Sequence, residues 1–219
     1  MKKNLVFDLD GTLIESAPDI HDAANRVLAD LNLAPLSMET VIGFIGNGVP
    51  KLVERVMAEV GIAFTNKRHA ELVGMFSTYY AVNPATLSYL NKGAQKSLSD
   101  LQKAGHKMAI CTNKPYDLTL QVLRCLNIEQ YFDVVIGGDS LAVKKPDPAP
   151  LQKAMELLGE KMCIYIGDSE VDAQTAQNAG QPFYLFTDGY RKTSVKEINP
   201  DAAFDDFAML QNLLENTDT

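Results

Sequence analysis

Residues 4–12 read NLVFDLDGT, in which a short apolar run leads directly into two aspartates that lie two positions apart. The run Asn4–Phe7 predicts a buried β-strand, because it is short, apolar and followed by a turn signal. In an extended chain, residues i and i+2 project to the same side, so Asp8 and Asp10 are expected to face one pocket. Gly11 lets the chain turn sharply there at low steric cost.

Two carboxylates this close repel each other unless a cation lies between them. Mg²⁺ is the simplest candidate, because it prefers oxygen ligands and is commonly held by one or two carboxylates together with a substrate phosphate. An Asp-x-Asp-Gly string also occurs in ordinary loops and in calcium-binding loops. The interpretation therefore depends on what the rest of the chain supplies.

A second apolar run, residues 108–111, predicts another buried strand, which ends at Thr112 and Asn113. The Thr112 hydroxyl is then placed to bind a phosphate oxygen. Lys145 lies on a proline-stiffened loop just before a helical stretch. A fixed cation at that point can neutralise a phosphoryl group and an anionic carboxylate.

A third run, residues 162–166, leads into Asp168, Ser169 and Asp172, which add a third carboxylate and a fourth behind it. Taken singly, these segments also fit a helix cap, a surface loop and a turn. Together they place polar clusters at the carboxyl ends of apolar strands, which is where open α/β sheets bind ligands. The combination therefore predicts a single site for phosphoryl chemistry.

With these four segments the chain resembles the haloacid dehalogenase superfamily of phosphatases. Its motifs occur in that family's order at residues 8–12, at Thr112-Asn113, at Lys145-Pro146, and at Gly167-Asp168 with Asp172. Within the superfamily, the chain is similar to bacterial phosphoglycolate phosphatases at residues 7–18 (FDLDGTLIESAP), 45–48 (IGNG), 135–139 (VIGGD) and 144–146 (KKP). Residues 90–93 of this chain read LNKG, where related sequences usually read more like Phe-Pro-Gly. This departure concerns the hinge rather than the chemistry.

The resemblance implies catalysis through an aspartyl-phosphate intermediate, with Asp8 as the nucleophile. Asp10 would protonate the departing alkoxide and later take a proton from the attacking water. Asp8, the main-chain carbonyl of Asp10 and Asp168 would be the protein ligands of Mg²⁺, the implied cofactor.

The resemblance also assigns the neighbouring polar residues. Thr112 and Lys145 would stabilise the phosphoryl oxygens, with Asn113 as a further substrate contact. Asp172 and Ser169 would orient the site from behind the residues that touch the substrate.

The predicted fold class is α/β: a Rossmann-like, doubly wound parallel sheet as the core, with an inserted all-helical cap domain. The core is expected at residues 1–14 and 88–219, and the cap at residues 15–87. Four helices are predicted in the insert, at residues 18–31, 37–44, 49–60 and 66–80, the last capped by Asn66.

From about residue 93 onward, strands and helices alternate as in a parallel sheet. Strands are predicted near Met108, Val134, Met162 and Phe183, and helices near Leu98, Leu120, Leu151, Ala176 and Leu210. We expect residues 216–219 to fray at the chain end.

The helical insert is expected to act as a lid that closes over a small substrate and excludes water. Gly46 and Asn47 are candidate substrate contacts at its tip, because glycine allows close backbone approach and Asn47 can bind a carboxylate or hydroxyl. The same segment could instead merely link two helices. Lys51 and Arg55, one helical turn apart, are further candidates for a substrate carboxylate, although paired basic residues on a helix are more often solvated.

The net charge of −8 argues against non-specific binding to nucleic acid or to an anionic membrane. No apolar run has the length of a signal-peptide core or a membrane span, so we expect a cytoplasmic protein. The cysteines at 111, 125 and 163 are expected to be reduced core residues. The three histidines show no metal-ligand spacing.

The expected partner is a small phosphorylated metabolite, and the resemblance favours 2-phosphoglycolate. Pyrophosphate, pyridoxal phosphate and sugar phosphates are alternative substrates, and a sugar-phosphate mutase would need a further base in the cap, for which His21 is the nearby candidate. A haloacid dehalogenase would need neither Asp10 nor Asp168. A phosphoacceptor signalling module is the non-enzymatic alternative, against which the large insert argues. Both a monomer and a homodimer are compatible with the sequence.

Overall fold

The structure is a computed structural model, and it describes residues 2–216. Fraying was predicted for residues 216–219, of which residues 217–219 lie outside the described range. No helix among the described residues is both long enough and apolar enough to cross a membrane.

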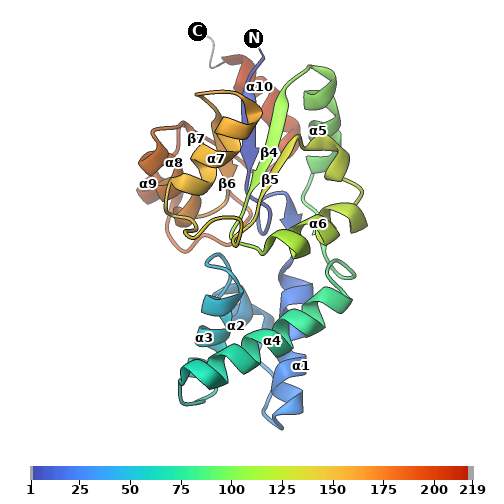
Figure 1. Cartoon of the computed structure of the whole chain (residues 1–219). Helices are drawn as coiled ribbons and strands as arrows, with labels where there is room; N and C mark the ends of the chain where they lie inside the picture. The colour runs from blue at the N-terminus through green and yellow to red at the C-terminus, as the bar shows by residue number, and fades with distance from the viewer. Residues whose placement is uncertain (1, 217–219) are drawn as a thin grey trace.

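A six-stranded parallel sheet forms the larger part of the molecule (Figure 1). Its strands lie in the order β5-β4-β1-β6-β7-β8, and every neighbouring pair is parallel. Their bounds are β1 Asn4–Phe7, β4 Lys107–Cys111, β5 Val134–Ile136, β6 Ile164–Gly167, β7 Phe183–Phe186 and β8 Ala202–Phe204. The predicted α/β class with a parallel sheet is confirmed. The edge strand β8 was not predicted from the sequence.

Both faces of the sheet are buried, because alternate residues of each strand enter different apolar clusters. In β1, Leu5 and Phe7 pack on one face and Val6 on the other. Helices α5 (Ala94–Lys103), α6 (Tyr116–Cys125) and α10 (Leu210–Asn216) cover the first face, and α7 (Ala149–Leu158), α8 (Glu170–Ala179) and α9 (Val195–Ile198) cover the second. This arrangement places helices on both sides of the sheet, as predicted.

The helical insert has an apolar core of its own and lies beyond one end of the sheet (Figure 1). Its helices are α1 Ala17–Asp30, α2 Met38–Ile42, α3 Val49–Glu59 and α4 Asn66–Val82. The predicted cap residue of α4 is wrong: Thr65 has extended backbone, and its hydroxyl accepts a hydrogen bond from Arg68 N at 3.1 Å. Asn66 is therefore the first helical residue.

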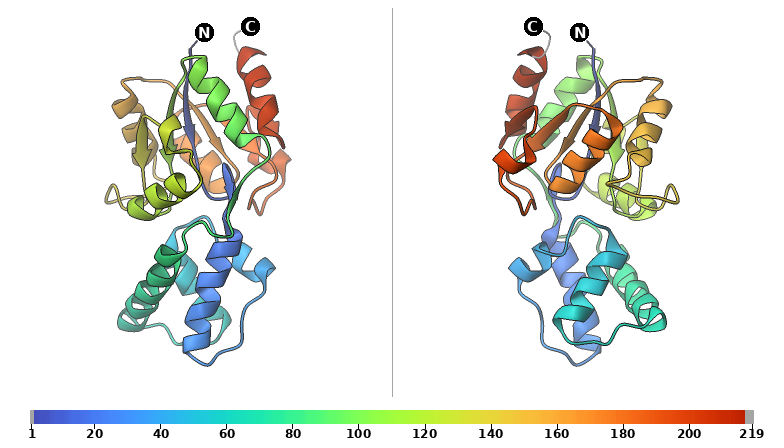
Figure 2. Two further views of the ribbon diagram at one scale, coloured as in Figure 1. Left: turned by 90° about the vertical axis from the view of Figure 1, so that its right-hand side faces the viewer. Right: turned by 90° about the vertical axis from the view of Figure 1, so that its left-hand side faces the viewer.

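The chain crosses between sheet and insert twice, and the two crossings lie side by side (Figure 2). They pair as the short antiparallel strands β2 (Ile14–Glu15) and β3 (Tyr89–Leu90). Asn91, in the segment that departs from related sequences, donates its side-chain amide to Thr12 O at 2.7 Å. The carboxylate of Asp19 accepts from Ser88 N at 2.7 Å and from the Ser88 hydroxyl at 2.5 Å. Hydrogen bonds thus join the outgoing and returning segments.

Two further predictions need correction. Met162 is exposed, and the strand predicted at residues 162–166 begins two residues later, at Ile164. Cys111 and Cys163 are buried as expected, but Cys125 is exposed because it lies at the C-terminal end of α6, on the solvent side.

Candidate active site

The predicted site residues gather at the carboxyl edge of the sheet, beside the insert. Asp8 and Asp10 follow β1, Thr112 and Asn113 follow β4, Asp168 follows β6, and Lys145 lies on the loop between β5 and α7. Sheet-like hydrogen bonds continue beyond the strands, from Asp8 N to Ile166 O at 2.8 Å and from Thr112 N to Ile136 O at 3.0 Å. These bonds fix the backbone from which the polar side chains project.

Lys145 lies at the centre of the buried polar groups. Its Nζ is 2.8 Å from Asp8 Oδ1, 2.6 Å from Asp172 Oδ1 and 2.9 Å from the Tyr165 hydroxyl. Tyr165 was not a sequence candidate, although a tyrosine inside a buried strand needs a partner for its hydroxyl. The Tyr165 hydroxyl donates either to Asp172 Oδ1 at 2.9 Å or to Cys111 O at 3.0 Å, which leaves its lone pairs for the ammonium.

Asp168 and Asp172 are both buried, and each is held by its own hydrogen bonds. Asp168 accepts from the Thr12 hydroxyl at 2.7 Å and from Tyr190 N at 2.6 Å. Asp172 forms a capping box at the start of α8, where its Oδ2 accepts from the Ser169 hydroxyl at 2.6 Å. Asp172 therefore anchors both Lys145 and the helix that follows Asp168.

Burial dominates the electrostatics of these groups. It raises the pKa of Asp8 to about 6, against the opposing effect of Lys145, and raises that of Asp168 well above its usual range. Burial alone would lower the pKa of Lys145, but the carboxylates of Asp172 and Asp8 outweigh it and raise that pKa. The ammonium therefore stays charged. Ionisation of Asp8 and Asp168 is disfavoured, because nearby positive charge does not fully offset their burial and the neighbouring carboxylates.

The donor set fits a divalent cation. Carboxylate oxygens of Asp8, Asp168 and Asp172 lie within 4.8 Å of one another. Three carboxylates and the single ammonium of Lys145 sum to −2 when all are ionised, which one Mg²⁺ would balance. Asp8 Oδ1 is buried and makes no hydrogen bond with the described residues, although Lys145 Nζ is near it as an ion pair. Each Asp172 oxygen already has two partners, Lys145 and Tyr165 on Oδ1 and the N–H and hydroxyl of Ser169 on Oδ2. Each Asp168 oxygen accepts only one hydrogen bond, so Asp8 and Asp168 are the carboxylates with lone pairs left for a cation.

The carboxylate of Asp10 points away from this cluster and toward the insert. Lys114 Nζ donates to Asp10 Oδ1 at 2.9 Å and to Oδ2 at 3.2 Å. It also donates to the Tyr80 hydroxyl on α4 and lies 4.4 Å from the centroid of the Tyr80 ring. Sequence reasoning did not single out Lys114 or Tyr80, because their positions in the chain give no sign that they meet.

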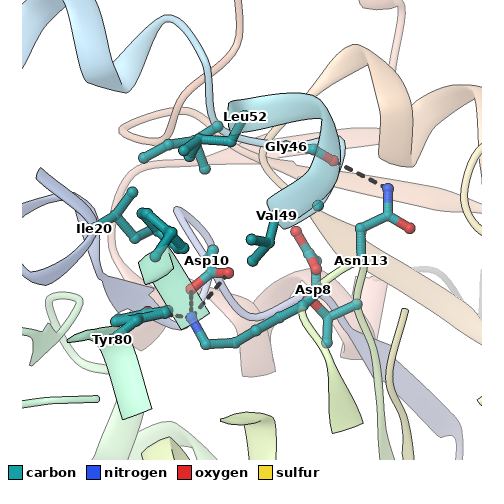
Figure 3. Close-up of a pocket in the computed structure, with 13 residues that line it drawn as sticks. Asp8, Asp10, Ile20, Gly46, Val49, Leu52, Tyr80 and Asn113 are labelled. Atoms are coloured by element: carbon teal, nitrogen blue, oxygen red, sulfur yellow. Dashed lines mark hydrogen bonds and ion pairs between the residues drawn. The ribbon is translucent and has the colours of Figure 1, made fainter. Parts of the chain in front are cut away.

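A small cavity of about 40 Å³ lies between these groups and the insert. Figure 3 shows Asp10 between Asp8 on one side and Ile20 and Tyr80 on the other. Thr112 and Asn113 also line the cavity. His21 does not line it: its Nε2 is 2.9 Å from Leu36 O, within the insert.

The predicted tip, residues 46–48, contacts the sheet directly. Asn113 Nδ2 donates to Gly46 O at 3.0 Å, and a Cβ at Gly48 would lie 2.9 Å from Asn113 O. The Asn47 side chain accepts from Arg55 Nη2 at 2.8 Å. Asn113 thus touches the insert as well as the cavity, and Arg55 supports the loop.

Lys51 does not reach the cavity. Its Nζ pairs with Glu54 at 2.6 Å on the half-exposed surface of α3. Lys144 and Lys192, on the sheet side, instead donate to main-chain carbonyls of the loop, at Asn47 (2.9 Å) and Gly43 (2.6 Å).

Comparison with known proteins agrees with this geometry. The model of the haloacid dehalogenase-like hydrolases matches residues 5–186. The chain belongs to the haloacid dehalogenase-like hydrolase family. This is a family of enzymes, so the superfamily and the enzymatic function predicted from the sequence are both confirmed. Phosphatases of this family generally use Mg²⁺.

Several relatives match nearly the whole chain. A phosphoglycolate phosphatase of Cereibacter sphaeroides is 47% identical over 210 residues, which cover 96% of each chain. A phosphoglycolate phosphatase of Rhodobacter capsulatus is 41% identical over 219 residues, with 98% of each chain covered. The crystal structure of a predicted phosphoglycolate phosphatase from Haemophilus somnus 129pt superposes with a TM-score of 0.91 at 32% identity, covering 97% of this chain and 98% of that one.

Proposed function

We propose that this protein is a Mg²⁺-dependent phosphatase that hydrolyses a small phosphate monoester, with 2-phosphoglycolate as its substrate. The observation that carries the chemistry is the pair of carboxylates after β1, one in a buried acidic cluster and the other turned toward a cavity. The relatives named phosphoglycolate phosphatase support the choice of substrate.

In the first step, an Asp8 carboxylate oxygen attacks phosphorus, and the bond from phosphorus to the ester oxygen breaks. Asp10 gives a proton to the departing alkoxide, which leaves as glycolate. In the second step, water attacks the phosphorus of the aspartyl-phosphate while Asp10 takes a proton from it. The bond between phosphorus and Asp8 then breaks, which releases phosphate and restores both carboxyl groups.

Asp8, the main-chain carbonyl of Asp10 and Asp168 would hold Mg²⁺, which would neutralise charge on the phosphoryl group when bound. Lys145 and Thr112 would stabilise the phosphoryl oxygens, and Asn113 would contact the same group. Asp172, fixed by Ser169, would keep the Lys145 ammonium in place.

Residues 1–14 and 88–219 would form the catalytic core and residues 15–87 the cap. The cap would close over the substrate through the loop that holds Gly46 and Asn47, and closure would exclude water during the first step. The two hydrogen-bonded crossings β2 and β3 are the place where such a motion would pivot.

The test is kcat/KM for phosphate release with Mg²⁺ across a panel of 2-phosphoglycolate, pyrophosphate, pyridoxal phosphate and glucose phosphates. A preference of about a hundredfold for 2-phosphoglycolate, worth roughly 2.7 kcal/mol of transition-state discrimination, is expected. Similar kcat/KM values across the panel would support a phosphatase but reject 2-phosphoglycolate as its preferred substrate. Interconversion of glucose phosphates would indicate a mutase, and a stable phosphoprotein without turnover would indicate a signalling module.

A further inference from the structure

The cavity beside Asp10 has two chemically different sides. The sheet side carries Asp8, Thr112 and Asn113, which suit a phosphoryl group. The side formed by the insert is apolar apart from the Tyr80 hydroxyl; its residues are Ile20, Ile45, Val49, Leu52 and Phe76. In the proposed reaction, the atoms attached to the ester oxygen must lie between Asp10 and this second side.

Lys114 lies at the boundary between the two sides. It is the only lysine or arginine among the described residues that line this cavity, and its side chain is 2% exposed. A cation removed from water attracts an anion far more strongly than one on the surface. Its partners are Asp10 and Tyr80, one from the sheet side and one from the insert.

Hydrogen-bonding capacity remains in this pair. Tyr80 accepts from Lys114, and its own hydroxyl hydrogen has no acceptor in the described part of the chain. Burial, followed by the nearby carboxylates of Asp10 and Asp19, raises the pKa of Tyr80, so the phenol keeps that hydrogen. An Asp10 oxygen that donates a proton to the ester oxygen cannot at the same moment accept from Lys114. Lys114 keeps the other Asp10 oxygen and Tyr80 as partners, and one of its three N–H groups is then free for an acceptor in the cavity.

We infer that Lys114 and Tyr80 form the leaving-group subsite and select esters whose leaving group carries a carboxylate next to the ester carbon. Lys114 would pair with one carboxylate oxygen and the Tyr80 hydroxyl would donate to the other. In 2-phosphoglycolate a single methylene separates the carboxylate from the ester oxygen, which suits a cation in contact with Asp10. The inference rests on the proposed function and assigns the selection to these two residues instead of Lys51 and Arg55.

The experiment compares kcat/KM for 2-phosphoglycolate with that for 2-hydroxyethyl phosphate, which has a neutral hydroxyl in place of the carboxylate. In Lys114→Met the ratio of the two values should fall by about tenfold or more, because only the charged leaving group loses an ion pair. Tyr80→Phe retains the ring and the buried packing and should lower the ratio by a smaller factor. Lys153→Met, which removes an exposed lysine on α7, should leave the ratio unchanged.

The outcomes separate this inference from the proposed function. If Lys114→Met lowers both kcat/KM values equally, Lys114 only positions Asp10, and the subsite is overturned while the phosphatase assignment stands. If the wild type shows no preference between the two esters, the proposed substrate and the subsite are both rejected. If Lys114→Met does not fold, an unchanged ratio in Tyr80→Phe overturns the shared subsite.

Discussion

At the scale of single residues, the proposed chemistry depends on a buried ammonium surrounded by carboxylates. Lys145 contacts Asp8, Asp172 and Tyr165 within 3 Å, and this fixes the direction of the side chain of Asp8, the proposed nucleophile. Such a group is expensive to bury unless each charge is paired and hydrogen-bonded, as these are. In the proposed mechanism the same contacts would hold Asp8 in position for attack.

Asp8→Asn should lower kcat by roughly three or more orders of magnitude, because an amide cannot replace the attacking carboxylate. The measurement is phosphate release from 2-phosphoglycolate and from any other ester that the wild type hydrolyses. Asp22→Asn, at an exposed aspartate paired with Arg26 on α1, is the matched control and should retain full activity. Turnover near the wild-type value in Asp8→Asn would remove Asp8 as the nucleophile.

The sequence predicted the residues that belong to short local motifs, such as Asp8, Thr112 and Asp168. It did not predict the roles of Lys114, Tyr165 or Tyr190. Lys114 meets Asp10 across 104 positions and Tyr80 across 34, and no local pattern records such a meeting. Tyr190 is similar: its main-chain N–H binds Asp168 and its hydroxyl donates to Glu15 at 2.5 Å, near the first crossing.

At the scale of elements, the loop between α2 and α3 is the part of the insert that meets the sheet. Its carbonyls at residues 43, 46 and 47 accept from Lys192, Asn113 and Lys144, all of which lie outside the insert. Gly48 ends this loop with a φ of +80° and packs against the Asn113 backbone. The loop therefore contacts the sheet part through main-chain atoms, so the course of its backbone matters more than which side chains it carries.

Gly48→Ala should lower kcat/KM by tenfold or more, because its Cβ would lie 2.9 Å from Asn113 O and would hold the loop off the sheet. Gly61→Ala is the control, since Gly61 also has a positive φ, of +73°, but has open space around it. Gly61→Ala should lose about 1 kcal/mol of unfolding free energy because of its positive φ. Gly48→Ala should lose more, up to about 3 kcal/mol, because a φ of +80° with a ψ of 167° is a conformation that essentially only glycine adopts. Equal kcat/KM values in the two variants, measured beside their melting temperatures, would show that loop contact is not needed for catalysis.

Elements were predicted well where a long apolar pattern defines them and poorly where it does not. The buried strands β1, β4, β6 and β7 are continuous apolar runs, which explains why sequence found them. The paired crossings β2 and β3 have two residues each, and β8 has three, so their pairing depends on the tertiary structure. The shortening of α2 to Met38–Ile42 has a similar cause, because the chain after Ile42 turns to meet the sheet.

At the scale of the whole molecule, stability and metal binding are linked through Asp8. Its pKa is about 6 in the folded protein and 3.8 in an unfolded chain, so the folded state holds this proton more tightly. The stability that this preference contributes is complete below pH 3.8 and is lost as the pH rises through 6. At neutral pH the metal-free protein therefore bears the cost of an ionised, buried Asp8.

Mg²⁺ should raise the melting temperature at pH 7.5 and should do so much less at pH 5, where protons compete for Asp8. At a concentration of 100 times its dissociation constant, the ion adds about 2.7 kcal/mol, which for a chain of this length is roughly 5–10 °C. The measurement is thermal unfolding with and without Mg²⁺ at both pH values. Asp168→Asn is the comparison and should abolish most of the shift; an equal shift at both pH values would contradict the linkage.

The paired crossings β2 and β3 make the enzyme modular. Because adjacent antiparallel strands lie about 5 Å apart, the insert departs from and rejoins the chain of the hydrolytic half at a single point. A helical unit from another family member whose ends lie equally close could be spliced in without rerouting the sheet. Recombination at this junction would replace the Tyr80 side of the proposed leaving-group subsite and leave Lys114 and the carboxylates that follow β1 in place.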